Sequence, residues 1–176
     1  MAAEDVRAFI ADHLSVEHFA AYLADDAHYA VLVAEPVTGG AGGPALVGYT
    51  LLVLPLDPAE PPYADDVAVL VRQRPAAELS KCYVLPAYQG TGVAGALLEA
   101  TIAAAESADV AGEPVAALWL GTNRANRRAQ RSYARHGFTV AGTRRFRVGK
   151  ALEEDVVMVR PLRGVAETTA PPAAAR

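Results

Sequence analysis

Cysteine is nearly absent from this chain of 176 residues, which contains a single one, Cys82. One cysteine excludes an intramolecular disulfide, and a reducing cytoplasm is the compartment that we expect. No apolar run approaches the roughly 20 residues that a membrane-spanning helix needs. The chain also does not open with the pattern of a secretory signal peptide. We therefore expect no association with a membrane.

An excess of basic residues and a set of metal ligands are missing as well. The formal net charge is −4, which argues against a general nucleic-acid-binding protein. The histidines are scattered without the spacing of metal ligands: His13, His18, His28 and His136. We expect no metal site. The length predicts one domain, residues 1–163, and the Ala, Pro and Thr composition of 164–176 predicts a disordered tail.

Hydrophobic patterns predict a mixed α/β fold in which strands alternate with helices and a hairpin follows. Ser15 is the expected N-cap of one helix, and Gly137 the left-handed residue that ends another. The segment 67–71 is too short for a choice between a strand and a helical turn. We expect helices at 4–14, 16–24, 92–108 and 124–136, and strands at 29–34, 46–54, 78–84, 115–120, 139–147 and 155–162.

The most informative segment joins a strand that ends near Pro86 to a helix rich in alanine and leucine. It reads Gln89-Gly90-Thr91-Gly92-Val93-Ala94-Gly95. The first backbone N–H groups of a helix have no partner within it, and the helix dipole places partial positive charge there. Because glycine has no side chain, an anion can approach these amides. The segment therefore predicts a phosphate-binding site.

One interpretation of this segment is a dinucleotide-binding loop, because Gly90, Gly92 and Gly95 match the pattern GxGxxG. That pattern is weak evidence by itself. A dinucleotide fold needs its glycines directly after a strand and a carboxylate at the end of the next one. Here residues 86–89 intervene, and the next strand ends in Gly121-Thr122. Binding of a nicotinamide cofactor is therefore the least favoured alternative.

Taken as Gln89-x-x-Gly92-x-Ala94, the same segment resembles the acetyl-CoA motif of the GNAT superfamily of N-acetyltransferases. A second block about thirty residues later, from Asn126 to Phe138, resembles that family position by position. It reads Asn126-x-x-Ala129-x-x-x-Tyr133-x-x-x-Gly137-Phe138. The resemblance covers about 29–162. Within it, 78–84, 119–121 and 146–158 look most similar to bacterial spermidine/spermine acetyltransferases.

The resemblance implies a GNAT-type mixed, mostly antiparallel sheet flanked by helices, with one departure. Members of the family normally open with a strand and a long helix, whereas this chain starts inside that helix. We therefore expect the first strand to be missing. The strand at 29–34 would then be an open edge, at which two copies of the chain could pair as a homodimer. The alternatives are that the start is truncated or that another segment covers this edge.

The resemblance also implies acetyl-CoA as the co-substrate and assigns residues to it. The pantetheine arm would contact the free backbone of a splayed strand and the side chain of Asn126, which is otherwise an ordinary first-turn residue. A backbone amide near Val84 or Leu85 would stabilise the oxyanion. The pyrophosphate would bind the amides of Gln89, Gly90, Thr91, Gly92, Val93 and Ala94.

Two side chains are the candidates for proton transfer. Tyr133 matches the family's general acid, which protonates the leaving thiolate; the alternative is a core aromatic residue. Glu78 is the candidate base, because strand alternation would place it on one face with Cys82 and Val84. A carboxylate paired with a neighbouring cation is the alternative. Cys82 is expected to be a small buried residue and not a nucleophile.

These assignments predict transfer of an acetyl group to a primary amine by direct attack in a ternary complex. A small polyamine is the preferred acceptor, and a protein N-terminus or lysine the alternative. A non-catalytic acyl-CoA-binding module is the rival function. The polyamine preference rests on an acidic loop: Asp57, Glu60, Asp65 and Asp66. A basic stripe either is solvated or attracts phosphates: Arg124, Arg127, Arg128, Arg131 and Arg135.

Overall fold

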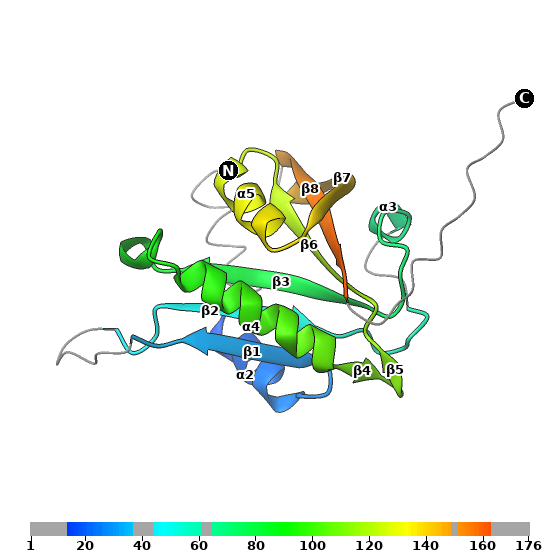
Figure 1. Ribbon diagram of the computed structural model, residues 1–176, viewed down its shortest axis with the longest axis horizontal. Helices are drawn as coiled ribbons and strands as arrows, with labels where there is room; N and C mark the ends of the chain where they lie inside the picture. Colours follow the sequence, from blue (N-terminus) through cyan, green and yellow to red (C-terminus); the bar gives the residue numbers. More distant parts are fainter. Residues whose placement is uncertain (1–13, 37–43, 61–64, 149–150, 163–176) are drawn as a thin grey trace, which may run out of the picture.

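The computed structural model describes residues 14–36, 44–60, 65–148 and 151–162 (Figure 1). A six-stranded sheet forms its centre, with the strand order β1-β2-β3-β6-β8-β7. β3 and β6 pair in parallel and the other neighbours are antiparallel. The strands are β1 (Tyr29–Ala34), β2 (Gly48–Val53), β3 (Ala76–Val84), β6 (Ala117–Asn123), β7 (Thr139–Val148) and β8 (Ala151–Pro161). The expected mixed, mostly antiparallel sheet is confirmed.

Helices lie on both faces of this sheet. α4 (Val93–Ser107) crosses one face over β1, β2 and β3, while α2 (Val16–Ala24) lies behind the sheet and contacts β1 (Figure 1). α5 (Arg127–Arg135) follows β6. Residues 67–71 are not a strand. The short helix α3 (Asp65–Ala68) ends within this segment, and a turn follows it. The sequence did not predict the 3₁₀ turn η1 (Pro86–Tyr88) or the small hairpin of β4 (Asp109–Val110) and β5 (Glu113–Pro114).

The two predicted helix boundaries are confirmed. The Ser15 hydroxyl accepts a hydrogen bond of 3.3 Å from the amide of His18, which caps α2. Gly137, just beyond α5, has a φ of +84°. Three predictions concern residues outside the described ones. They are the helix at 4–14, the absence of the first strand and the disordered tail at 164–176. Within the described residues, β1 pairs with β2 and forms one edge of the sheet.

α4 is held to the sheet by an apolar face with one polar contact inside it. The Thr101 hydroxyl donates to the carbonyl of Leu97 at 2.7 Å and lies 2.7 Å from the hydroxyl of Thr50 on β2, so both buried threonines are satisfied. The buried side chains of α4 are Leu97, Leu98, Thr101, Ile102 and Ala105. This packing fixes the start of α4 beside the end of β3.

β3 and β6 separate part-way along their length. Their described pairing runs from Ala76 opposite Ala117 to Glu78 opposite Trp119 and ends there. Beyond that point β3 stays with β2 up to Val84, and β6 stays with β8 up to Asn123. The sheet therefore opens in a V, and the backbone of β3 on that side is free for other partners.

A β-bulge in β3 decides which side chains face which side of this V. Leu51 of β2 lies opposite Lys81, but the next residue, Leu52, lies opposite Leu79, so Ser80 is the extra residue. Leu79 and Cys82 consequently both pack in the core beneath α4.

The same bulge places Glu78 on the other face. Glu78 lies opposite Val53 on β2, and Lys81 opposite Leu51, whereas Cys82 lies opposite Thr50 beneath α4. The prediction that Glu78 shares a face with Cys82 and Val84 is wrong, because strict alternation fails across a bulge. No described helix is long and apolar enough to cross a membrane.

Candidate active site

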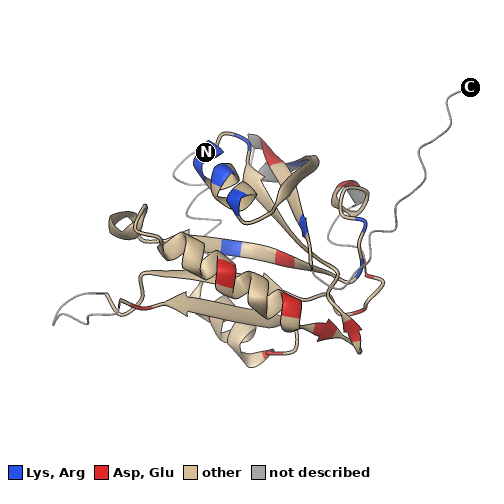
Figure 2. Ribbon diagram, in the orientation of Figure 1, with Lys and Arg blue, Asp and Glu red and all other residues tan. Residues whose placement is uncertain are grey.

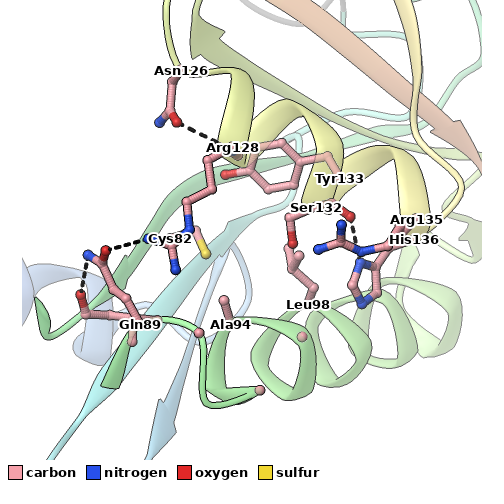
Figure 3. Close-up of a pocket in the computed structure, with 15 residues that line it drawn as sticks. Cys82, Gln89, Ala94, Leu98, Asn126, Arg128, Ser132, Tyr133, Arg135 and His136 are labelled. Atoms are coloured by element: carbon pink, nitrogen blue, oxygen red, sulfur yellow. Dashed lines mark hydrogen bonds between the residues drawn. The ribbon is translucent and has the colours of Figure 1, made fainter. Parts of the chain in front are cut away.

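A cleft of about 480 Å³ lies between the end of β3, the start of α4 and one side of α5 (Figure 3). It brings together the two blocks that the sequence analysis singled out. Its lining includes most of the predicted cofactor-binding residues and the predicted acid: Val84, Gln89, Gly90, Gly92, Ala94, Asn126 and Tyr133. Thr91 and Val93 lie in the same loop and first turn.

The glycine loop leaves the first amides of α4 uncovered. Gly90 and Gly92 have φ angles of +88° and +96°, and Gly92 is the left-handed N-cap of α4. A Cβ on Gly92 would meet no atom within 4 Å, so nothing in the described protein covers this position. The Thr91 hydroxyl donates to the carbonyl of Tyr88 at 2.6 Å and fixes the loop. The loop is therefore open to an anion at the positive end of the helix.

Arg128 adds a side-chain cation to this loop. Its Nη1 donates to Oε1 of Gln89 at 3.1 Å, and its Nη2 would lie 3.6 Å from a Cβ on Gly90. Gln89 in turn donates through Nε2 to the carbonyl of Val84 at 3.4 Å. The basic stripe was expected either to be solvated or to attract phosphates, and the contact with Gln89 distinguishes Arg128 within it. The stripe was the available signal, since Figure 2 shows basic residues gathered along α5.

Hydrogen bonding along β3 distinguishes the two candidate oxyanion donors. The amide of Leu85 donates to the carbonyl of Val47 at 2.9 Å, so it is already used. In an antiparallel pair, bonded and non-bonded positions alternate. Val84, which lies opposite Gly48, therefore points its own amide away from β2 and into the V. Of the two, Val84 is the donor that this pairing leaves available, and it stays the candidate.

Tyr133 reaches from α5 toward β3. Its ring packs edge-on against buried Phe138 at a centroid distance of 6.0 Å, and its hydroxyl interacts with the Cys82 thiol. Burial raises the pKa of Tyr133 well above its usual range, and the neighbouring Cys82 adds to the effect. Burial also raises the pKa of Cys82 to about 11, against a smaller lowering by its bond with Tyr133. Both groups are therefore protonated at neutral pH, which agrees with a non-nucleophilic Cys82.

Asn126 and His136 line the two ends of the α5 wall. The Asn126 side-chain oxygen accepts from the amide of Ala129 at 3.1 Å, so Asn126 is the N-cap of α5. The nitrogen of its amide can still donate to a ligand. His136 Nδ1 donates to the carbonyl of Ser132 at 2.8 Å, and its Nε2 lies 3.9 Å from a Glu99 carboxylate oxygen on α4. His136 thus contacts both walls of the cleft.

Glu78 lines a second cleft, of about 410 Å³, on the opposite face of the sheet. Burial raises the pKa of Glu78 to about 7, and the positive charges of Arg144 and Lys81 oppose that rise. A carboxyl group with this pKa can release and accept a proton near neutral pH. Glu78 lines the second cleft and Tyr133 the first, so the two side chains lie on opposite faces of the sheet near the V.

Carboxylates predominate among the charged groups that line this second cleft. Asp25 and Glu60 line it together with Glu78, and among the described residues no lysine or arginine does. Asp25 accepts from His28 Nδ1 at 2.9 Å, and Glu60 accepts from the amide of Leu56 at 2.7 Å. Of the predicted acidic loop, Glu60 is thus placed at the cleft. Asp57 instead accepts from the amide of Ala59.

The comparisons with known proteins agree with this geometry. The model of the acetyltransferase (GNAT) family matches residues 4–138. The chain belongs to this family. It is 39% identical over 162 residues to an uncharacterized N-acetyltransferase of Mycobacterium tuberculosis, which covers 92% of this chain and 85% of the relative. The predicted family and the predicted enzyme class, an acyltransferase, are confirmed. The narrower resemblance to spermidine/spermine acetyltransferases is not.

Solved structures of low identity share the fold. NAA60 of Arabidopsis thaliana, in complex with a bisubstrate analogue, superposes with a TM-score of 0.68 at 14% identity, over 94% of this chain and 97% of that one. The ribosomal-protein-S18-alanine N-acetyltransferase of Escherichia coli gives 0.58 at 22% identity, over 97% and 96%. The PaiA N-acetyltransferase of Thermoplasma acidophilum, in complex with coenzyme A, gives 0.58 at 17%, over 92% and 80%.

Proposed function

We propose that this GNAT protein transfers the acetyl group of acetyl-CoA to a primary amine by direct attack in a ternary complex. The observation that carries the proposal is the V between β3 and β6. It has a phosphate-type glycine loop and Tyr133 on one side, and a carboxylate of raised pKa on the other. Donor and acceptor can thus meet from opposite faces without a covalent intermediate on the enzyme.

The donor side of the site fits acetyl-CoA. Residues 89–94 would hold the pyrophosphate through backbone amides, and Arg128 would add a charge-assisted contact. The nitrogen of the Asn126 side chain would donate to the pantetheine arm. The amide of Val84 would stabilise negative charge on the thioester oxygen as the bond to nitrogen forms. The GNAT family and the coenzyme A in the PaiA structure support this co-substrate.

Each proton transfer has one residue in this scheme. Glu78 accepts a proton from the incoming ammonium, directly or through a water molecule, and later passes it to solvent. The amine nitrogen then forms a bond to the acetyl carbon as the carbon–sulfur bond breaks. Tyr133 gives its proton to the leaving sulfur and regains, through water, the second proton that the positively charged nitrogen releases after the bond to carbon has formed. The products are the acetylated amine, CoA thiol and one proton.

A small polycationic amine is the acceptor class that we propose. The second cleft supports it, because Asp25, Glu60 and Glu78 line it and no lysine or arginine in the described part of the chain does. Lys81 lies on the same face of β3, and its positive charge lowers the pKa of Glu78. The same charge repels a cationic acceptor and so reduces this preference. A protein N-terminus or lysine is the second candidate class, and an acyl-CoA-binding module without catalysis is the rival function.

A two-step measurement tests the proposal. First, the thermal midpoint is compared with excess acetyl-CoA, CoA, NADH or no ligand. At about a hundred times the dissociation constant, a ligand adds about 2.7 kcal/mol, a rise of several degrees for this size. We expect a rise with both CoA species and none with NADH. A rise with NADH alone would instead support the dinucleotide alternative.

The second step measures turnover on spermidine, a lysine peptide and an N-terminal peptide. We expect the largest kcat/KM with spermidine. Preference for either peptide would overturn the polyamine part, and CoA binding without turnover on a broad amine panel would favour the binding module. A cytoplasmic location follows from the lone thiol under the same proposal. We also propose that two copies of the chain pair through β1. A measurement of the molecular mass in solution tests this pairing.

A further inference from the structure

Arg144 of β7 lies on the face of the sheet that carries Glu78. Its Nη2 is 3.3 Å from a carboxylate oxygen of Asp155, the residue opposite it on β8. Its guanidinium also lies 5.8 Å from the ring centroid of Trp119. Trp119 is in turn the residue of β6 that lies opposite Glu78 in the last pair before the V. Arg144 therefore lies on the same face as the candidate base and against Trp119, the cross-strand neighbour of Glu78.

Gly121 of β6 makes room for this arrangement. A Cβ at that position would lie 2.7 Å from Nη2 of Arg144 and 3.0 Å from its Cζ. The arginine side chain therefore lies across β6 over a residue that has no side chain of its own. With only a fifth of its side chain exposed, Arg144 is held by the carboxylate of Asp155 and the ring of Trp119.

The electrostatic surroundings of Glu78 come from several elements. Arg144 and Lys81 are the two cations that act on it, and both lower its pKa, against the larger opposing effect of burial. Lys81 lies 5.0 Å from the ring centroid of Tyr22 on α2. Among the described residues, other titratable groups on this side include Asp25, His28, Tyr29, Glu60, Tyr49, Tyr83, Glu153 and Asp155.

We propose that Arg144 is a positioning residue for Glu78: held by Asp155 and Trp119, its guanidinium favours the carboxylate form of Glu78, which is the form that accepts the ammonium proton. The inference rests on the proposed function, in which Glu78 is the base. Arg144 touches neither substrate in this scheme and acts through Glu78 alone. Lys81, on a long side chain near the protein surface, is the second and less constrained cation.

The decisive measurement is an NMR titration of the Glu78 side-chain carboxyl carbon in the full chain. In the wild type we expect a midpoint near 7. In Arg144→Gln we expect the midpoint to rise by about one unit, the lower end of the effect of a neighbouring opposite charge. Arg144→Lys keeps the charge and should restore most of the wild-type value. An unchanged midpoint in Arg144→Gln would overturn the proposal.

Activity provides a second readout with a defined pH dependence. If the midpoint moves from 7 to 8, the charged fraction at pH 7 falls from about a half to about a tenth. The kcat/KM of Arg144→Gln should then be about fivefold lower than the wild type at pH 7 and nearly equal to it at pH 9. A loss that is the same at every pH would indicate a structural role and contradict the inference.

Two further variants separate charge from folding. Arg145→Gln removes an arginine from the adjacent position, where the side chain is exposed and pairs with Glu154 at 3.1 Å; it should leave the Glu78 titration unchanged. An equal shift in this control would mean that net charge, and not position, is responsible. If Arg144→Gln alone does not fold, the double variant Arg144→Gln/Asp155→Asn removes the pair as a whole, and an upward but smaller shift is expected because the negative charge of Asp155 is removed too.

The titration and the turnover assays fail independently. The NMR midpoints need no substrate, so an unchanged midpoint overturns the role of Arg144 even if the wild type acetylates amines. Conversely, a wild type without turnover on any amine overturns the proposed function, while a shifted midpoint would still show that Arg144 controls the charge of Glu78.

Discussion

Gln89 and Arg128, 39 residues apart in the chain, are joined by a hydrogen bond of 3.1 Å between Oε1 and Nη1. The bond connects the glycine loop before α4 to the first turn of α5, and Gln89 extends it to the carbonyl of Val84. The glutamine of the family motif thus has two contacts in this protein. It holds the end of β3 and orients an arginine toward the loop.

Replacing Arg128 by glutamine should weaken acetyl-CoA binding by about tenfold, because a charge-assisted hydrogen bond contributes about 1.5–3 kcal/mol. The loss should be greatest at low salt, since screening already weakens an exposed charge. Isothermal titration at two salt concentrations measures it. Arg131→Gln is the matched control, as it removes an arginine from the same helix at a position that does not line the cleft. Equal losses in both variants would show that the overall positive charge of α5, and not the position of Arg128, causes the effect.

Tyr133→Phe should lower kcat by about a hundredfold and leave the affinity for acetyl-CoA nearly unchanged. Phenylalanine keeps the contact with Phe138 and removes only the proton donor. Steady-state kinetics and ligand titration together test this expectation. Wild-type turnover in the variant would exclude Tyr133 from the mechanism. A large loss of acetyl-CoA affinity would instead show that its hydroxyl binds the donor.

Gly92→Ala should cost stability and affinity together. With φ at +96°, an alanine is strained by about 1–2 kcal/mol although its Cβ would meet no protein atom. That corresponds to a thermal midpoint lower by a few degrees. The added methyl group would also stand over the amides proposed to bind pyrophosphate, so acetyl-CoA affinity should fall.

Gly112→Ala is the matched control for this effect. Gly112 has a φ of +85° and equally open surroundings, but it lies in the turn between β4 and β5, away from the cleft. Its midpoint should fall by a similar amount with no change in affinity. If Gly92→Ala bound acetyl-CoA as the wild type does, the loop would not be the pyrophosphate site.

Glu78→Gln should abolish the rise of kcat/KM with pH that we expect around pH 7. It should also change the pH dependence of stability. Because the pKa of Glu78 rises from 4.5 unfolded to about 7 folded, the folded wild type loses stability as the pH increases from about 4.5 to 7. The difference is on the order of 3 kcal/mol. Urea unfolding at pH 5 and 8 measures it.

From pH 5 to pH 8 the wild type should lose stability and Glu78→Gln should not. The variant should therefore be more stable relative to the wild type at pH 8 than at pH 5. A difference that does not change with pH would mean that Glu78 titrates alike in the folded and unfolded chain. Retained stability with an unchanged pH–rate profile would assign the proton transfer to another group.

Local patterns predicted most of the elements in the described chain. β1 has the expected bounds, and α2, α4 and α5 agree with expectation to within a few residues, because each has a clear cap or a change of periodicity. β6 starts two residues later than predicted and ends three residues later, and β8 starts four residues earlier. Such errors arise because the ends of strands are set by their partners across the sheet.

Two features of the site were not accessible in this way. Arg128 belonged to a stripe of similar arginines, and only its contact with Gln89 distinguishes it. Leu85 and Val84 were equal candidates for the oxyanion donor until the bond from Leu85 to Val47 showed which amide is free. Both choices depend on partners far away in the sequence.

The sequence by itself determined the family, the glycine loop and the two blocks that meet in one cleft, because these are patterns of residue type at fixed spacing. The tertiary structure alone decided on which face Glu78 lies. Alternation along an isolated strand predicted one face for Glu78, Cys82 and Val84. The bulge at Ser80 arises only when β3 pairs with β2, and it turns Glu78 toward Trp119 and Arg144, where a base can approach an acceptor from the other side.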